Sequence, residues 1–287
     1  MTEAVERHEP IEDYHLDRDY DSKTCVSSFL DRPSSYWKKY LAPPEFREPF
    51  KKSKSLRMGG ACHVKTQEPE LWNELYLVAP YKTRSAAAFR AIVAENPDKT
   101  VLTLTEYDEI CRMAQALWDN PETRHYLEIA GDVEKSFYYT DPVTGTKLKT
   151  RPDKTSHDSV YLIDIKTTQS IAAYSFLCDT DKYKYWLSPP ISFRGIEAVR
   201  ATRPKAYVYL LVENRGEKRP DTDVFFADEE SIEYGQLKLN ETLFGLKKCK
   251  ETDYWPCSHN PKPKPVGLKS YRKQELERLR MESDYAG

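Results

Sequence analysis

The sequence predicts an α/β domain whose strands lie mainly in the middle of the chain. Three observations lead to this fold class. Apolar residues recur at helical spacing in several segments before residue 120. The spacing changes to the two-residue period of strands over residues 126–166, and residues 206–212 form a strong apolar strand pattern. Helical spacing returns over residues 229–247, and this order is typical of a sheet covered by helices.

The first half of the chain is expected to be mainly helical. Residues 1–22 are polar and acidic, and we expect them to form a loosely held N-terminal arm. Gly59 and Gly60 would let a helix pack closely against a neighbour, and Thr105 with Asp108 resembles a capping box that opens another helix. The elements expected after the arm are a helix over 23–40, a Pro- and Lys-rich loop over 42–55, a helix from Leu56 that carries His63, a helix over 84–94, and a helix with the apolar stripe Ile110, Met113 and Leu117.

The second half is expected to begin with a strand meander. Its strands are expected at Tyr126–Ile129, Val133–Tyr139, Lys147–Arg151 and Val160–Ile165, with a turn over 140–145. The later elements are expected to be a helix over 170–187, strands Ala206–Val212 and Val224–Ala227, a helix over 229–247, a Pro- and Lys-rich linker over 261–265, and a charged helix Ser270–Glu282. The chain therefore divides into an arm (1–22), a single domain (23–257) and a tail (258–287).

Composition narrows the class of protein. The 287 residues suffice for one large domain or two small ones. A net charge of −2 excludes a globally basic nucleic-acid coat, but it is compatible with a locally basic channel around an acidic site. The six cysteines include no CxxC pair, which disfavours a zinc site of the usual spacing; without a signal peptide, reduced thiols in a cytoplasm are expected. No apolar run reaches the roughly 18 residues that span a bilayer, so no membrane association is expected.

The most informative motif lies in residues 151–166. Pro152-Asp153 is followed, after ten residues, by Asp164-Ile165-Lys166 at the end of an apolar strand. Two carboxylates brought together there could bind Mg²⁺, which prefers hard oxygen ligands, and the Ile165 carbonyl is a further candidate ligand. Lys166 shares a strand face with Asp164 and could orient a water that attacks a phosphodiester. The alternative is a solvated hairpin with surface ion pairs, which the apolar surroundings of Asp164 disfavour.

Two residues outside this motif could complete the site. Glu134 lies one strand earlier in the expected meander and could bind the metal directly or through water. His63 is a softer ligand that would also favour tolerance of Mn²⁺. Taken singly, each is more simply explained as an ordinary core or surface residue. Their combination with Asp153 and Asp164 favours a nuclease site.

These residues resemble the RecE-type exonucleases (exonuclease VIII) of the PD-(D/E)xK nuclease superfamily, which also includes lambda exonuclease. CVSSFLDRPSSYWKKYL is similar to the family's serine-containing helix, and SLRMGGACHVKTQEP is similar to its Gly-x-x-x-His helix, which places His63 at the metal-ligand histidine. GDVEKSFYYTDPVTGTKLKTRPDK resembles its Glu hairpin and Arg-Pro-Asp, which places Glu134 and Asp153. YLIDIKTT resembles its Asp-x-Lys strand, which places Asp164 and Lys166, and the Tyr254-Trp255-Pro256 segment resembles its C-terminal Trp-Pro.

The resemblance implies a restriction-endonuclease-like core, a mixed central β-sheet flanked by helices. It also implies Mg²⁺-dependent, 5′-to-3′ degradation of one strand of linear duplex DNA from its ends, by a ring-shaped trimer or tetramer. The implied partner is a RecT-like single-strand annealing protein, in phage or prophage recombination within a bacterial cytoplasm. The chain departs from the pattern at Ser188, where the family carries a glutamine; Tyr183 or Tyr185 could take over that role.

Several residues are candidates for DNA contact. They are Lys149 and Arg151 before the metal motif, and Ser27, Ser28 and Arg57 near the 5′ phosphate or adjacent backbone. The plain alternative for Lys149 and Arg151 is a solvated strand face. Two other functions stay open: a Cas4-like or RecB-like nuclease with an iron–sulfur cluster, disfavoured because only Cys249 and Cys257 are close in sequence, and a non-catalytic DNA-binding assembly protein.

Overall fold

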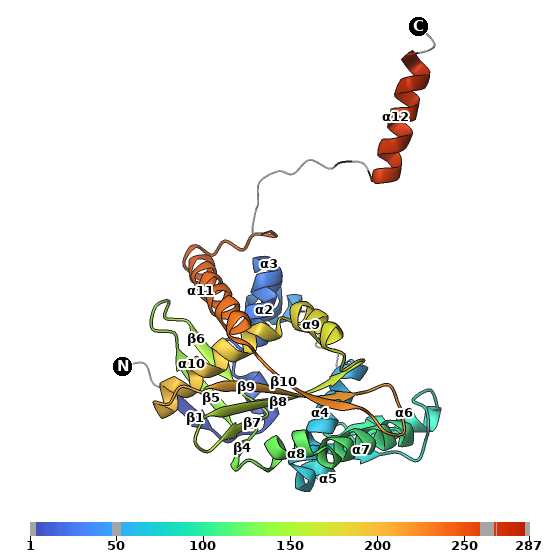
Figure 1. Ribbon diagram of the computed structural model, residues 1–287, viewed down its shortest axis with the longest axis vertical. Coiled ribbons are helices and arrows are strands. Elements are labelled where there is room, and N and C mark those ends of the chain that lie inside the picture. The colour runs from blue at the N-terminus through green and yellow to red at the C-terminus, as the bar shows by residue number, and fades with distance from the viewer. Residues whose placement is uncertain (1–3, 48–52, 259–266, 268, 285–287) are drawn as a thin grey trace.

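The computed structural model describes residues 4–47, 53–258, 267 and 269–284. A mixed five-stranded sheet in the order β10-β9-β8-β7-β4 lies at its centre, with helices on both faces (Figure 1). A three-stranded sheet (β1-β5-β6) and a parallel pair (β2-β3) accompany it. The strands are β1 Val5–Arg7, β2 Tyr76–Val78, β3 Thr100–Leu102, β4 Gly131–Val133, β5 Ser136–Thr140, β6 Lys147–Thr150, β7 Lys154–Ser156, β8 Tyr161–Thr168, β9 Ala206–Glu213 and β10 Thr222–Phe226.

Helices form most of the remaining described chain. Shorter turns are a π-helical Trp37–Leu41 and 3-10 turns at Pro44–Phe46, Pro69–Leu71 and Tyr185–Leu187. The α-helices are α1 Ile11–Leu16, α2 Lys23–Asp31, α3 Pro33–Tyr36, α4 Lys54–Gln67, α5 Trp72–Leu75, α6 Ala87–Glu95, α7 Leu104–Asp119, α8 Pro121–Glu128, α9 Ala173–Lys182, α10 Ser188–Arg200, α11 Glu229–Thr252 and α12 Ser270–Asp284. None of the helices in the described part of the chain combines the length and apolarity that crossing a bilayer needs.

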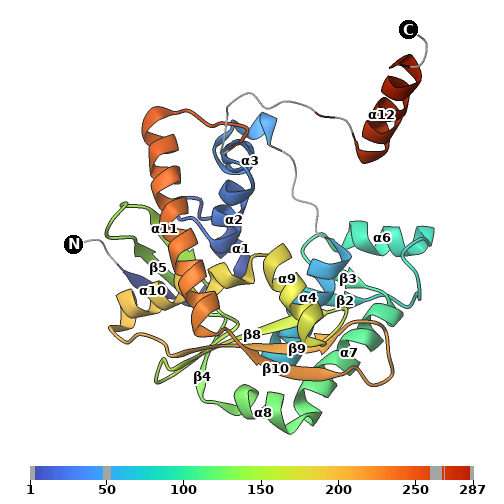
Figure 2. The same ribbon diagram turned by 45° about the horizontal axis from the view of Figure 1, so that its top comes forward.

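Strand β8 lies at the centre of the structure, because its two faces pack into two different hydrophobic layers. Ile163 and Ile165 pack with α4, α7 and the facing side chains of β9. Leu162 points to the other face, where α9 and α10 cover the sheet. The parallel pairing of β8 with β9 requires a crossover, and α9 and α10 supply it. Figure 2 shows α9, α10 and α11 on one side of the sheet and α7 and α8 on the other, and α4 packs in the same hydrophobic layer as α7. The predicted α/β class with a mixed sheet is therefore confirmed.

The N-terminal segment is packed, contrary to the loosely held arm that we expected. Strand β1 pairs with β5, and Tyr14 is buried. Asp21 is also buried and bridges to Leu148 of β6. Acidic side chains of the N-terminal segment form ion pairs with the rest of the domain, such as the pair of Glu6 with Arg200 at 2.8 Å. Local polarity indicated an exposed arm, but pairing with strands more than 100 residues away decides its structure.

Several element boundaries also differ from expectation. The expected strand Tyr126–Ile129 is instead the last turn of α8 and its C-cap, Ile129, because Asn120 caps the start of that helix and Pro121 occupies its first turn. The capping box that opens α7 is Thr103 with Glu106, not Thr105 with Asp108: each side chain meets the other residue's backbone N–H, at 3.2 and 3.0 Å.

The expected strand Val133–Tyr139 is two strands of different sheets, β4 and β5, and the short β7 and the helix α10 were missed. The expected helix 23–40 breaks at Arg32, which is extended before Pro33. The expected linker 261–265 lies outside the described residues. The charged helix after it forms α12, which stands apart from the other elements in both views (Figures 1 and 2).

Two glycines of α11 offer a matched test of helix packing. A Cβ on Gly235 would lie 2.0 Å from the carbonyl oxygen of Trp186, whereas a Cβ on Gly245 would meet ring atoms of Phe29 at 3.1 Å. Alanine usually stabilises a helix interior by about 1 kcal/mol relative to glycine. We expect Gly235→Ala instead to destabilise the protein by about 1–3 kcal/mol, because a backbone carbonyl must move. Gly245→Ala should cost less, because a ring can shift. Chemical denaturation of both variants checks this, and equal stability would contradict it.

Candidate metal centre

The centre is built where β7 starts beside the middle of β8. Lys154 of β7 pairs with Ile163 of β8, so Asp153, one residue before β7, reaches the next part of β8. The backbone N–H of Ile165 donates a hydrogen bond of 2.6 Å to Oδ2 of Asp153. Within a strand, the N–H and C=O of one residue point to the same side, so the Ile165 carbonyl also faces Asp153. Its role as a metal ligand stays a prediction.

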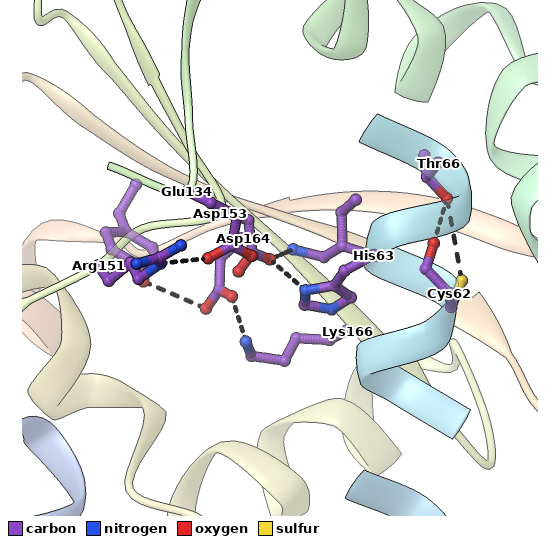
Figure 3. A network of polar contacts seen from close by, with 10 residues as sticks. Cys62, His63, Thr66, Glu134, Arg151, Asp153, Asp164 and Lys166 are labelled. Atoms are coloured by element: carbon purple, nitrogen blue, oxygen red, sulfur yellow. Dashed lines mark hydrogen bonds and ion pairs between the residues drawn. The ribbon is translucent and has the colours of Figure 1, made fainter. Parts of the chain in front are cut away.

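Three candidate ligands converge at this point. His63 comes from α4 and places Nδ1 3.3 Å from Oδ2 of Asp153. One ligand atom from each of His63, Glu134 and Asp153 lies within 4.8 Å of the other two. Figure 3 shows His63 and Arg151 on opposite sides of the carboxylates. Segments 90 residues apart in the sequence therefore meet as predicted, and their function in metal binding stays a prediction.

Glu134 reaches the group through an unusual backbone conformation. Its φ of +50° lies in the left-handed region, which costs a non-glycine residue on the order of 1–3 kcal/mol. Its N–H bonds to the carbonyl of Asp153 at 3.0 Å, and its carboxylate accepts a bond of 2.7 Å from Nε of Arg151. The turn between β4 and β5 thereby directs an acidic side chain to the metal centre.

Asp164 and Lys166 lie beside this group and not within it. Both share the β8 face that is turned towards α9 and α10, and Lys166 Nζ pairs with Oδ1 of Asp164. The other carboxylate oxygen accepts a hydrogen bond of 3.1 Å from the hydroxyl of Tyr207. Asp164 is thus oriented by two donors next to the three-residue group, and its predicted role as a metal ligand is untested.

Charge crowding sets the protonation of the centre. Burial and the neighbouring Asp153 raise the pKa of Glu134 to about 7. Burial opposes a charge on His63, but Asp153 outweighs it and raises the pKa of His63 to about 9. Burial also opposes ionisation of Asp153, yet His63 and Lys166 lower its pKa to about 2. Burial opposes the charge of Lys166 too, but Asp164 and Asp153 hold its pKa well above the ordinary value.

The donor set fits a divalent cation. Two carboxylates and an imidazole suit Mg²⁺, Mn²⁺ or Zn²⁺ in principle, and the excess of oxygen donors favours the harder ions. Glu134, whose raised pKa reports repulsion by Asp153 and burial, would be relieved by a cation between the two acids. His63, Glu134 and Asp153 would hold the ion, with Asp164 beside them.

Two of the residues predicted to contact DNA, Arg57 and Lys149, form contacts within the protein instead. Arg57 pairs with Glu106 at 2.7 Å and joins α4 to the start of α7. Lys149 is only 3% exposed, and its ammonium donates to the carbonyls of Tyr14 and Asp17, which makes it a support for α1 and not a surface contact. These partners are distant in sequence, so the basic residue types alone suggested DNA.

The other predicted contacts divide between the centre and α2. Arg151 faces the metal centre, where it bonds Glu134 and the Glu9 carbonyl (2.9 Å). Ser28 is buried and accepts a bond of 3.2 Å from Lys39. Ser27 carries a buried hydroxyl without a hydrogen-bond partner in the described structure. Of these residues, only Arg151 contacts the candidate metal ligands.

Tyr207 is the site residue that we did not predict. It lies on β9, buried, and its hydroxyl contacts both Asp164 and the side chain of Ser188. Ser188, the position that departs from the family's glutamine, therefore connects to the site through this tyrosine. The alternation Tyr207-Val208-Tyr209 on a strand next to Asp164 was the available signal, because strand side chains on one face lie close to their neighbours.

Comparisons with known proteins identify the family and the fold to which this chain is similar. A family model described as a PDDEXK-like domain of unknown function (DUF3799) matches residues 23–260. A search of curated proteins finds no match. Among solved structures, a putative exonuclease from Eubacterium rectale matches with a TM-score of 0.57 and 11% identity, over 91% of this chain and 97% of that chain. At this identity the structural match shows the fold alone; together with the PDDEXK-like family model it confirms the restriction-endonuclease-like core predicted from the sequence.

Metal binding should release protons. At pH 7 the metal-free centre holds a proton on His63 and a partial proton on Glu134, and both must leave for the ligands to bind. We expect between one and two protons released per Mn²⁺ bound at pH 7, and tighter binding as the pH rises from 6 to 9. Calorimetry in buffers of different ionisation enthalpy measures this. His63→Asn should remove about one proton, His125→Asn on α8 should change nothing, and pH-independent binding would contradict the assignment.

Proposed function

This chain belongs to the PDDEXK-like family DUF3799 and so to the PD-(D/E)xK nuclease superfamily, and we propose that it is a Mg²⁺-dependent exodeoxyribonuclease. The observation that carries the proposal is the convergence of His63, Glu134 and Asp153 within 4.8 Å beside the Asp164–Lys166 pair. This combination of three candidate metal ligands and a fixed ammonium matches what phosphodiester hydrolysis needs.

Each residue of the site has a distinct part in the proposed reaction. When bound, the cation would polarise the phosphate and lower the pKa of a water. Asp153, fixed by the Ile165 N–H and His63, holds a carboxylate at the centre of the group. Glu134 is turned towards it by Arg151.

Lys166 supplies the positive charge next to the reacting phosphate. Its ammonium is held on the Asp164 carboxylate, which Tyr207 fixes from the other side. An ammonium in this place can orient the attacking water and offset the negative charge that develops on the phosphate. Because the donors are already in position, little reorganisation is needed when the substrate binds.

The finer specificity that we propose is 5′-to-3′ digestion of one strand of linear duplex DNA in the manner of RecE-type exonucleases. Support comes from the motifs with His63, Glu134, Asp153 and Asp164–Lys166, which occur in the family's order, and from a fold neighbour described as a putative exonuclease. From the same resemblance we propose that the protein binds the ends of duplex DNA and assembles as a ring-shaped homo-oligomer. We also propose that a RecT-like annealing protein acts on the exposed 3′ strand, in a phage or prophage setting.

Substitutions at the site should abolish nucleotide release. We expect Lys166→Ala and Asp153→Asn to lower the cleavage rate of linear duplex DNA by at least about 100-fold, with the fold retained. Lys238→Ala is a matched control, because that lysine lies half-exposed on α11 and its ammonium pairs with Glu241. Release of acid-soluble nucleotides with Mg²⁺ is the measurement. An inactive wild type would refute the enzyme, and active site variants would refute the site.

Polarity can be read from end labels. A duplex labelled at its 5′ ends should lose label at the start of digestion, and a 3′-labelled duplex should keep its label until late, because one strand is removed from its 5′ end. A covalently closed circle of the same sequence should resist digestion. Early loss of the 3′ label or cutting of the circle would contradict the proposed specificity and leave a nuclease of another type.

A further inference from the structure

Lys23 is a half-buried lysine that no part of the proposed metal centre uses. It opens α2, which stands between α9 and α11 in Figure 2. Its ammonium donates a hydrogen bond of 2.5 Å to the carbonyl of Tyr183. Among the residues that the structure describes, no carboxylate lies within ion-pair distance of it. Burial of an unpaired charge raises the free energy of the folded protein unless an anion lies next to it.

Lys23 shares a neighbour with the lysine of the nuclease motif. Its Nζ lies 5.3 Å from the centre of the Tyr185 ring, and Nζ of Lys166 lies 5.4 Å from the same ring. The two ammonium groups therefore border one aromatic side chain, although they come from segments more than 140 residues apart. Lys23 is thus part of the surroundings of the reacting groups.

Two other lysines, Lys166 and Lys184, act on the charge of Lys23. Lys166 is compensated by Asp164, and the nearby Lys184 is compensated by Asp31 at 2.8 Å. Lys23 has no carboxylate at ion-pair distance among the described residues, and the acid that attracts its charge, Asp164, is already paired with Lys166. Burial and the charge of Lys166 lower the pKa of Lys23 to about 8, so the ammonium is still the main form at neutral pH. An added anion near these groups would lower the free energy of the charged form.

We infer that Lys23 binds a phosphate of the DNA strand being cut, next to the phosphate that reacts at Lys166. The inference rests on the proposed nuclease function, because the substrate brings the missing anion. The shared chemistry is a phosphate oxyanion, which could belong to a terminal 5′ phosphate or to an internal phosphodiester. Lysine binds such groups as a point charge, and both ammonium groups lie near the Tyr185 ring.

The test compares three variants of the full-length protein. Lys23→Met removes the charge and keeps an apolar stem, Lys23→Arg keeps the charge, and Lys38→Met removes an exposed lysine of the π-helical segment Trp37–Leu41 as a control. Steady-state cleavage is measured on linear duplexes with a 5′ phosphate or a 5′ hydroxyl. We expect Lys23→Met to raise KM about tenfold with kcat little changed, Lys23→Arg to restore most of the loss, and Lys38→Met to resemble the wild type.

Salt dependence gives a readout that a merely structural lysine would not change. Binding of wild type and variants to the same duplexes is measured by fluorescence anisotropy in EDTA, over a range of salt. A lost phosphate contact should reduce the slope of log K against log salt by about 0.9 for duplex DNA or about 0.7 for a single strand. An effect confined to 5′-phosphorylated ends would identify the terminal phosphate, and an effect on both ends an internal one.

Two failures are distinguishable. If the wild type digests DNA and Lys23→Met matches it in KM and salt slope, the phosphate assignment of Lys23 is wrong and the nuclease stands. If the wild type digests no DNA, the proposed function itself fails. Thermal unfolding of each variant identifies misfolding. If Lys23→Met is misfolded, the Lys23→Arg variant tests the inference instead: a folded arginine variant with weakened salt dependence would overturn it.

Discussion

The hydrogen bond between the Ile165 N–H and the Asp153 carboxylate is the contact on which the site depends. It ties the residue that precedes β7 to the middle of β8, and it fixes one carboxylate oxygen of Asp153. His63 meets the same oxygen from α4. Because β8 is buried on both faces, this point is rigid, and ligands from separate segments can be positioned against it.

Around this point the structure combines opposing electrostatic effects. Two buried acids repel each other, and His63, Arg151 and Lys166 compensate part of their charge. The raised pKa of Glu134 shows that burial and repulsion by Asp153 still outweigh these cations at that carboxylate. Breaking any buried pair would leave an uncompensated charge, which is costly. The same contacts that support the fold therefore prepare the centre for a metal ion.

The sequence predicted the central parts of this arrangement well. The apolar run around Asp164 indicated a buried strand, and alternation placed Lys166 on the same face. His63 was identified through the resemblance of its Gly-x-x-x-His segment to the RecE-type family. The sequence did not indicate the left-handed backbone at Glu134, because no glycine or asparagine marks that turn, and so β4 and β5 were merged. Arg57 and Lys149 were assigned to DNA because their partners, Glu106 and the α1 carbonyls, are remote in sequence.

The packed N-terminal segment has a consequence for how the molecule is made. Strand β1 pairs with β5 about 130 residues later, and the Glu9 carbonyl holds Arg151, which in turn holds Glu134. During synthesis the first segment leaves the ribosome long before its partners exist. Contacts of such large sequence separation form slowly, since the loop between them must close first. The metal centre is therefore completed late, when the first residues return to the strands that carry the acids.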